Sequence, residues 1–417
     1  MQGNPRTGVL KALVFFMFAM FAMTTDSVGV IIPQVIKRYS LGMTAGGSFQ
    51  YATMSGISIA AFGLGFLADR WGRKRSIVAG LVLFAAACAL FAVAREFLVF
   101  VALLFLSGVA IGVFKAGALA LIGDISRSTR EHSATMNMLE GFFGVGAIIG
   151  PAIVARLLLT GADWKWLYVI ASGLCAVLIA IAVFTRFPKP PAHASASARS
   201  LGETVSLLRD PFALMFSLAL MLYVATEAAV YVWGPTYLQG YSGSFGWFAL
   251  YMVSIFFVLR AAGRFVGAWL MARLAWAQVV AVCSTGVFVC FLIACAGGRG
   301  VGAVALPASG LFMSVLYPTI NSKGISSFPR PRHGEIAGLL LFFTCLSAVL
   351  APLAMAALSD AMGDAKYSLF LASGFAGVLA VLAVWNAVTN PTRGRLALRD
   401  DEDYLGEAVP AAGGVAP

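Results

Sequence analysis

Residues 65–75 read Gly-Phe-Leu-Ala-Asp-Arg-Trp-Gly-Arg-Lys-Arg, ending one apolar run at 46–68 and leading into the next at 76–95. The stretch carries a carboxylate, Asp69, beside a cluster of arginine and lysine. A glycine such as Gly65 permits close approach of helices, and clustered cations hold a connection at the cytoplasmic face of a membrane. The stretch therefore predicts a short cytoplasmic loop between two membrane-spanning helices.

The composition of the whole chain agrees with this. Of 417 residues, 60% are hydrophobic and 11% charged, with a mean hydropathy of +0.89. A soluble domain is about 45–50% apolar and about 25% charged. A cytosolic enzyme, a secreted domain and a disordered chain are therefore excluded. The apolar runs are continuous, whereas the strands of a membrane β-barrel alternate. The composition predicts an all-α membrane protein.

Twelve apolar runs are long enough to span a bilayer. They lie at 10–36, 46–68, 76–95, 97–123, 134–160, 166–187, 211–237, 245–270, 276–297, 301–325, 335–359 and 366–389. With a cytoplasmic N-terminus, the inner connections hold 18 Lys and Arg and the outer ones 6, which predicts that both termini are cytoplasmic. The net charge of +11 lies mostly in these connections, so we expect no nucleic-acid partner.

One segment interrupts the series of spans. Residues 188–210 are rich in Pro, Ala and Ser and are not apolar enough to span. We expect an N-terminal six-helix bundle at 1–187, a cytoplasmic linker at 188–210, a C-terminal bundle at 211–389 and a cytoplasmic tail at 390–417.

The two bundles repeat one another in sequence. A shift of 201 aligns Thr25-Asp26 with Thr226-Glu227 and Pro151 with Pro352. A shift of 202 aligns Ser107-Gly108 with Ser309-Gly310. An even number of spans in each repeat keeps both in the same orientation, which is the parallel repeat of transporters with a central cavity.

Four charged residues lie near the middle of spans, namely Asp26, Lys115, Glu227 and Arg260, and Glu140 lies nearer the cytoplasmic side. A charge at a helix centre costs roughly 2.5–3.5 kcal/mol, so these side chains should face a wet cavity or one another. A fixed salt-bridge network would satisfy this requirement. Alternatively, Asp26, Glu227 and Glu140 carry protons, while Lys115 and Arg260 bind substrate. The repeat makes Asp26 and Glu227 equivalent, so we expect them to face each other across the cavity.

Aromatic and amide side chains on the same spans would complete a site for a hydroxylated solute, because sugar faces stack on rings and hydroxyls pair with amides. The candidates are Gln50, Tyr51, Asn137, Tyr223, Tyr231, Trp233, Tyr317 and Asn321. Trp233 fits the aromatic belt at the outer membrane surface equally well.

The 65–75 stretch resembles the cytoplasmic signature of the major facilitator superfamily, with Gly65, Asp69, Arg70, Gly72 and Arg73 as its gate motif. Shorter stretches are similar to the fucose permease-like sugar:proton symporters. They are 141–151 (GFFGVGAIIGP), 223–227 (YVATE), 233–238 (WGPTYL) and 316–319 (LYPT). The resemblance implies proton-driven uptake of a small hydrophilic sugar by alternating access, in a monomer of the cell inner membrane.

The chain departs from that family at two positions. Relatives usually carry an acid where Lys115 stands and an asparagine where Leu119 stands. A cation in place of an acid widens the expected substrate to a sugar acid or another organic anion.

A proton-driven exporter of drugs or metabolites is the alternative. The glycines before Pro151 partly resemble the signature of superfamily antiporters, but Val154-Ala155 replace the pair of glycines expected after the proline. We find no nucleophile–base pair, metal cluster or nucleotide loop in the sequence. We therefore expect neither an enzyme nor a cofactor or metal, and a partner set of solute, protons and lipid.

Overall fold

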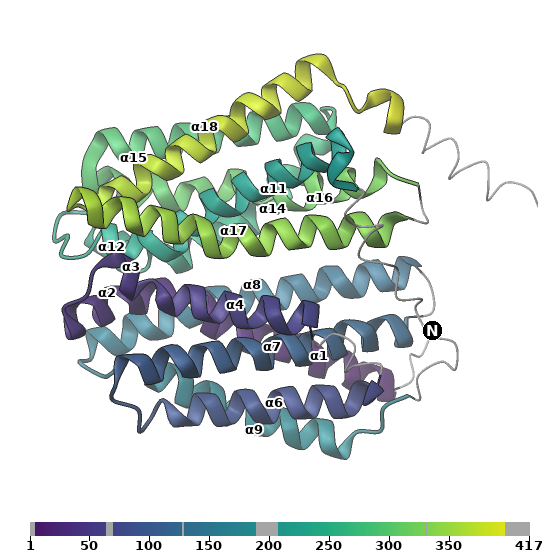
Figure 1. Ribbon diagram of the computed structural model, residues 1–417, viewed down its shortest axis with the longest axis vertical. Helices are drawn as coiled ribbons and strands as arrows, with labels where there is room; N and C mark the ends of the chain where they lie inside the picture. Colours follow the sequence, from purple (N-terminus) through teal and green to yellow (C-terminus); the bar gives the residue numbers. More distant parts are fainter. Residues whose placement is uncertain (1–4, 64–69, 127–128, 189–206, 330–331, 397–417) are drawn as a thin grey trace, which may run out of the picture.

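The computed structural model describes residues 5–63, 70–126, 129–188, 207–329 and 332–396, and every regular element in these ranges is a helix (Figure 1). The N-terminal half holds α1 (Pro5–Thr25), α2 (Val28–Tyr39), α3 (Met43–Gly46), α4 (Ser48–Gly63), α6 (Arg73–Leu90), α7 (Phe97–Ile125), α8 (Thr129–Leu159) and α9 (Trp166–Phe184). The C-terminal half holds η1 (Leu207–Arg209), α11 (Pro211–Ala228), η2 (Ala229–Trp233), α12 (Gly234–Tyr237), α13 (Gly246–Leu250), α14 (Met252–Met271), α15 (Trp276–Met313), α16 (Leu316–Ser326), α17 (His333–Met362) and α18 (Lys366–Thr389).

The predicted all-α membrane fold is confirmed. Within the described ranges, nine helical stretches are long and apolar enough to cross a membrane, and one of them, Trp276–Ser326, covers two predicted spans. That stretch bends at Gly298, whose φ of 69° suits a residue without a side chain. The described residues of each of the twelve predicted spans are largely helical, several of them in two consecutive helices, so the structure is consistent with that count. Large apolar side chains such as Phe184 and Phe265 point outward, as lipid contact requires.

The internal repeat is visible in how the helices cross. Gly108 of α7 lies against the backbone carbonyl of Thr53 in α4. Gly310 of α15, its equivalent at a shift of 202, lies against the backbone carbonyl of Phe256 in α14. Such close approach of two backbones requires a glycine. Second and fourth spans therefore cross in the same way in both halves, as a parallel repeat predicts.

The two described ends of the chain lie at the same end of the molecule, called here the terminal end (Figure 1). At the opposite, distal end, α2 and α3 of one half meet α12 and α17 of the other (Figure 1). The backbone N–H groups of Met43 and Thr44 donate to the two carboxylate oxygens of Asp360, each over 2.7 Å. The Nε2 of Gln239 donates to the carbonyl oxygen of Pro33 over 3.4 Å. These bonds close the distal end.

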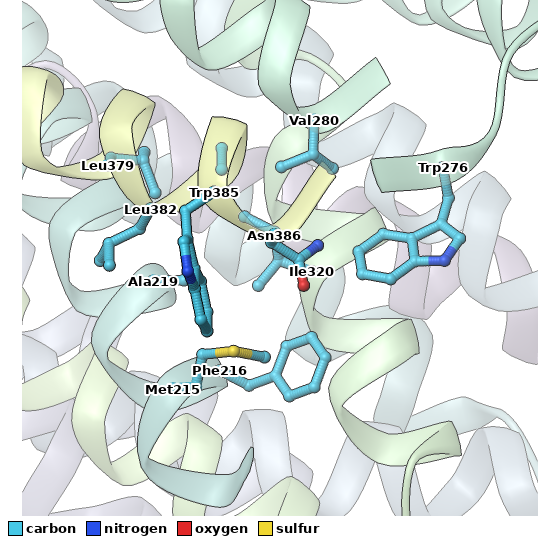
Figure 2. A pocket seen from close by; sticks show the side chains of 11 residues that line it. Met215, Phe216, Ala219, Trp276, Val280, Ile320, Leu379, Leu382, Trp385 and Asn386 are labelled. Atoms are coloured by element: carbon cyan, nitrogen blue, oxygen red, sulfur yellow. The ribbon is translucent and has the colours of Figure 1, made fainter. Parts of the chain in front are cut away.

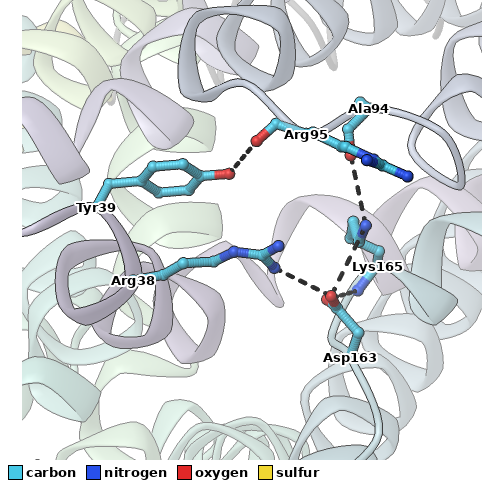
Figure 3. A network of polar contacts seen from close by, with 6 residues as sticks. All are labelled: Arg38, Tyr39, Ala94, Arg95, Asp163 and Lys165. Carbon is cyan, nitrogen blue, oxygen red and sulfur yellow. Dashed lines mark hydrogen bonds and ion pairs between the residues drawn. The ribbon is translucent and has the colours of Figure 1, made fainter.

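Loops of the N-terminal half are also joined to one another at the distal end. Arg38 pairs with Asp163 over 3.1 Å, and the Nζ of Lys165 lies 3.7 Å from the same carboxylate (Figure 3). Tyr39 donates to the carbonyl oxygen of Arg95 (Figure 3). Partly exposed pairs of this kind contribute little energy individually. Their effect is to hold the end of α2 and the connections α6–α7 and α8–α9 in a fixed arrangement.

At the terminal end, Asp210 joins the start of α11 to the segment that follows α18. One carboxylate oxygen accepts from the backbone N–H of Phe212, and Arg395 donates to both oxygens over 3.1 and 2.9 Å. Burial would raise the pKa of the Asp210 carboxyl, but the hydrogen bonds from Arg395 and the backbone hold it below its usual value. The carboxylate therefore stays ionised and holds the end of the C-terminal half in place.

We predict that replacing Asp360 with alanine opens the distal end. The variant loses two charge-assisted hydrogen bonds between the halves, each worth about 1.5–3 kcal/mol. Since about 1.4 kcal/mol changes an equilibrium tenfold, the population open at this end should rise by about tenfold or more. Distances between spin labels at Lys37 and Ser242, in a background without native cysteines, measure this population.

Asp364→Ala is the matched control for this measurement. Asp364 is an acid at the same end, but it accepts from the backbone N–H of Lys366 in its own half. Its removal should leave the distance distribution unchanged. Equal distributions for the Asp360→Ala variant and the native chain would show that Asp360 does not hold the halves together.

Candidate substrate and proton site

The first span is interrupted at its acid. The helix α1 ends at Thr25, and α2 begins at Val28, so Asp26 lies in a turn between two helical segments. Asp26 is 9% exposed, and the Thr25 hydroxyl donates to its Oδ2 over 3.1 Å. A carboxylate at such a break can reach groups on neighbouring helices that a regular helix would turn away from it.

The equivalent span of the second half changes from an α-helix to a π-helix at the corresponding place. Glu227 lies in the last turn of α11, directly before the π-helical segment η2. Short π-helical segments occur often at functional sites. The Oε1 of Glu227 forms an ion pair with the Nη1 of Arg260 on α14. The two side chains are 12% and 21% exposed, so the pair is largely withdrawn from solvent.

Three of the mid-span charges form one electrostatic cluster. Asp26, Glu227 and Arg260 lie close enough for each to act on the others, although they come from the first and second halves of the chain. The charge of Lys115 also acts on Asp26. The repeat-related acids thus lie within electrostatic range of each other, and one cation from each half acts on Asp26. Arg260, a candidate substrate ligand, is already paired with Glu227.

Lys115 has a different environment from Arg260. It projects from α7, and its Nζ lies 5.5 Å from the ring centroid of Phe21 and 5.8 Å from that of Phe18. An ammonium over aromatic rings is attracted by their negative faces. Within the described part of the chain, the Lys115 ammonium has no carboxylate within ion-pair distance. Sequence reasoning missed this ring pair, although phenylalanines three residues apart share a helix face.

Gln50 and Tyr51 bond across the interface between the halves, and Trp233 bonds within its own half, instead of lining open space. The Nε2 of Gln50 donates to the Tyr231 hydroxyl across the interface over 3.3 Å. The Tyr51 hydroxyl and the Nε1 of Trp233 both donate to the carbonyl oxygen of Pro352, over 3.3 and 3.1 Å. Trp233 is completely buried, so its interpretation as a belt residue at the membrane surface is wrong.

Two groups near the cluster retain hydrogen-bonding capacity. The Oε1 of Gln50 is buried and has no partner among the described residues, and the buried hydroxyl of Tyr223 lies beside Glu227. The Tyr223 ring lies 5.8 Å from that of Tyr317, which is half-buried. These groups could receive hydroxyls of a solute.

The remaining candidates are Glu140, which neighbours Arg260 of the cluster, Asn321, and Asn137, whose side chain is not described. Glu140 is exposed and lines a cavity of about 120 Å³ between α8 and α14, together with Arg260 and Arg264. Asn321 is half-buried on α16. The side chain of Asn137 lies outside the described residues.

The gate motif is described only in part. Gly65 and Asp69 lie outside the described residues. Arg70 is exposed. Gly72 has a φ of +84°, a conformation that favours glycine. Arg73 is buried and pairs with Asp124 at the end of α7 over 2.9 Å. In this structure Arg73 therefore contacts its own half.

A separate pocket lies in the C-terminal half between α11, α15, α16 and α18 (Figure 2). Its walls are mostly apolar, with Trp276, Trp385 and Phe216 around the side chain of Asn386 (Figure 2). It holds about 40 Å³ of open space, and none of the predicted site residues lines it. The charged cluster between the halves is therefore the candidate site. Among the described residues, no group of three His, Cys, Asp or Glu side chains could hold a metal ion.

The fold and this cluster define a class of protein, a secondary transporter built from two parallel repeats around a shared polar centre. The model of the Major Facilitator Superfamily matches residues 14–352, and the chain belongs to that superfamily. It is a multi-pass membrane protein and a transporter, not an enzyme. In a bacterium its place is the inner membrane.

Individual proteins resemble the chain over most of its length. It is 24% identical to the L-fucose-proton symporter of Escherichia coli over 396 residues, covering 87% of this chain and 90% of that protein. It is 23% identical to a glucose/galactose transporter of Brucella abortus, covering 84% and 87%. It is 24% identical to the quinolone resistance protein NorA of Staphylococcus aureus, covering 89% and 95%. A solved structure of the nucleoside transporter NupG has the same fold, with a TM-score of 0.72, 15% identity and coverage of 92% and 98%.

Proposed function

We propose that the chain is a proton-coupled symporter, which takes up a small hydrophilic solute by alternating access. The solute class is a sugar, a sugar acid or another organic anion. The observation that carries the proposal is the pair of repeat-related acids, Asp26 and Glu227, at helix interruptions beside the shared centre. The likeness to fucose and glucose/galactose transporters supports uptake of a hydroxylated solute.

The two acids differ in their partners, which suggests different tasks. Glu227 is fixed by its ion pair with Arg260, and breaking such a pair is costly. Asp26 accepts from the neutral hydroxyl of Thr25. A proton can therefore join Asp26 without breaking an ion pair. In this proposal Asp26 carries the proton, and the Glu227–Arg260 ion pair holds the C-terminal side of the cluster in place.

The closed distal end gives the proposal a direction. If the termini are cytoplasmic, as the distribution of Lys and Arg predicts, this structure is closed to the outside. The bonds of Asp360, Gln239 and Tyr51 across the interface would then break when the transporter opens outward to receive solute and proton.

Proton flux in vesicles tests the proposal. Liposomes containing the purified protein and a trapped pH dye receive L-fucose, D-glucose, D-galactose, D-glucuronate or D-galacturonate outside. A symporter acidifies the lumen when its solute enters, whereas protein-free vesicles report passive leakage. Asp26→Asn should abolish solute-driven acidification while leaving exchange of labelled solute across the membrane, because exchange needs no net proton movement. Glu227→Gln should reduce both.

The result that overturns the proposal is equally direct. If the Asp26→Asn and Glu227→Gln variants both still accumulate solute against its gradient with native proton flux, neither acid couples the transport. If solute enters through the native protein without any proton movement, the protein is a facilitator, which moves solute down its gradient without coupling.

Export remains the second candidate, because the chain resembles the quinolone resistance protein along nearly its full length. The same vesicles separate the two directions. Entry of a quinolone by exchange for protons would make the lumen alkaline, which is the opposite sign to symport.

A further inference from the structure

The charges at the centre cancel only in one protonation state. When Asp26 and Glu227 are both ionised, their negative charges balance Lys115 and Arg260. Glu227 and Arg260 form an ion pair with each other. The remaining balance is therefore between Asp26 and Lys115, which act on each other electrostatically without forming an ion pair within 4 Å.

The surroundings of Lys115 indicate what could compensate its charge. The rings of Phe18 and Phe21 attract the ammonium but carry no net charge. Uncompensated charges at the centre of a membrane span are expensive, so such a cation needs a counter-ion. Among the described residues Asp26 is a carboxylate on which the Lys115 charge acts across the cluster. Once Asp26 takes a proton, the ammonium has no negative partner there.

We infer that the solute supplies this missing charge, and that the transporter carries one monoanion together with one proton. The inference rests on the proposed function and names its substrate class. A proton enters from the outer solution and binds the Asp26 carboxylate, which leaves a net positive charge on Lys115. The carboxylate of the solute then pairs with the Lys115 ammonium. On the inner side, loss of the solute and of the proton restores the Asp26–Lys115 balance. Transport is therefore electroneutral.

The side chains around Asp26 indicate which chemical groups the solute carries besides its carboxylate. Thr25 lies beside it on the same span, Glu227 and Arg260 face it from the other half, and Tyr231 bonds to Gln50 nearby. The unpartnered Oε1 of Gln50 and the Tyr223 hydroxyl beside Glu227 suit hydroxyl groups of a solute. The solute is accordingly a small hydroxylated monocarboxylate, of which a sugar acid is the simplest example.

Matched pairs of solutes test the charge requirement. D-glucuronate differs from D-glucose, and D-galacturonate from D-galactose, in having a carboxylate at C6. In vesicles with a proton gradient and no membrane potential, the acids should enter and acidify the lumen, and the sugars should not. With equal pH on both sides, an inside-negative potential set by valinomycin and potassium should not accelerate uptake of the acids.

Variants of Lys115 link this selectivity to its charge. Lys115→Met should weaken binding of the acids by about 10- to 100-fold, as expected for loss of a charge-assisted bond. Lys115→Arg should retain most binding. Lys115→Glu restores the acid that fucose permease-like relatives usually carry there, and should admit the neutral sugar in place of its acid. Thermal stabilisation by each solute reports binding independently of transport, and the melting temperature without solute reports folding.

The outcomes separate the inference from the proposed function. Proton-coupled entry of neutral sugars that is accelerated by the inside-negative potential would overturn the anion inference and leave symport intact. Entry of the acids that responds to the potential would overturn the one-proton balance. Absence of any flux or stabilisation by the acids in a folded native protein would also overturn the inference. Entry of solute without proton movement would remove the proposed function itself.

Discussion

A Gly29→Val variant is expected to stay open at the distal end and to lose uptake by about tenfold or more. Gly29 lies in α2, two residues after the interruption of the first span. A Cβ built at this position would overlap the backbone carbonyl oxygen of Tyr231 in η2, on the opposite half. A backbone group cannot swing aside as a side chain can, so the two halves must separate. Overpacking costs about 1–3 kcal/mol, and about 1.4 kcal/mol changes a population tenfold.

The labelling rate of a cysteine introduced at a buried position of the distal end measures this opening. Thr236 of α12 is 9% exposed in the closed state, and a cysteine there should react with a membrane-impermeant maleimide about tenfold faster in the Gly29→Val variant. Gly173→Val on α9 is the control, because a Cβ at Gly173 meets open space. Native labelling and uptake in the Gly29→Val variant would mean that the first and seventh spans do not form the distal closure.

The sequence predicted the positions of the spans well, because long apolar runs need no tertiary information. It also predicted that Asp26 and Glu227 are equivalent, since the repeat preserved an acid at both places. It did not predict the turn at 26–27 or the π-helical segment at 229–233. Runs such as 10–36 and 211–237 remain apolar through these interruptions, so hydropathy alone shows no boundary there.

Contacts between the halves were harder to predict. The repeat did not indicate a functional role for Asp360, because the equivalent position 201 residues earlier is occupied by Leu159. Its bonds to Met43 and Thr44 exist only when the distal end is closed, so they depend on a conformation as well as on a fold. Likewise, the sequence placed Arg260 among possible substrate ligands, whereas the reach of its side chain across to Glu227 is a property of the packed helices.

An Arg260→Met variant is expected to be the least stable of the single charge variants. It leaves Glu227 largely buried without its cation, and breaking a buried pair in this way costs about 3–5 kcal/mol. The melting temperature should fall by about 3–6 °C. Arg38→Met removes one side of a more exposed pair, with side chains 45% and 32% exposed, and should lower the melting temperature by about 1 °C or less.

The double variant Arg260→Met/Glu227→Gln tests whether this loss comes from the unpaired carboxylate. A neutral amide at residue 227 no longer needs a counter-charge, so the double variant should recover most of the lost stability, although proton-coupled transport should remain impaired. Thermal unfolding of the four proteins in a double-mutant cycle gives the coupling between the two residues. If the double variant is no more stable than Arg260→Met, the arginine stabilises the protein through its packing against Phe257 and not through its charge. In that case the ion pair would not fix Glu227, and Glu227 would be as free as Asp26 to carry the proton.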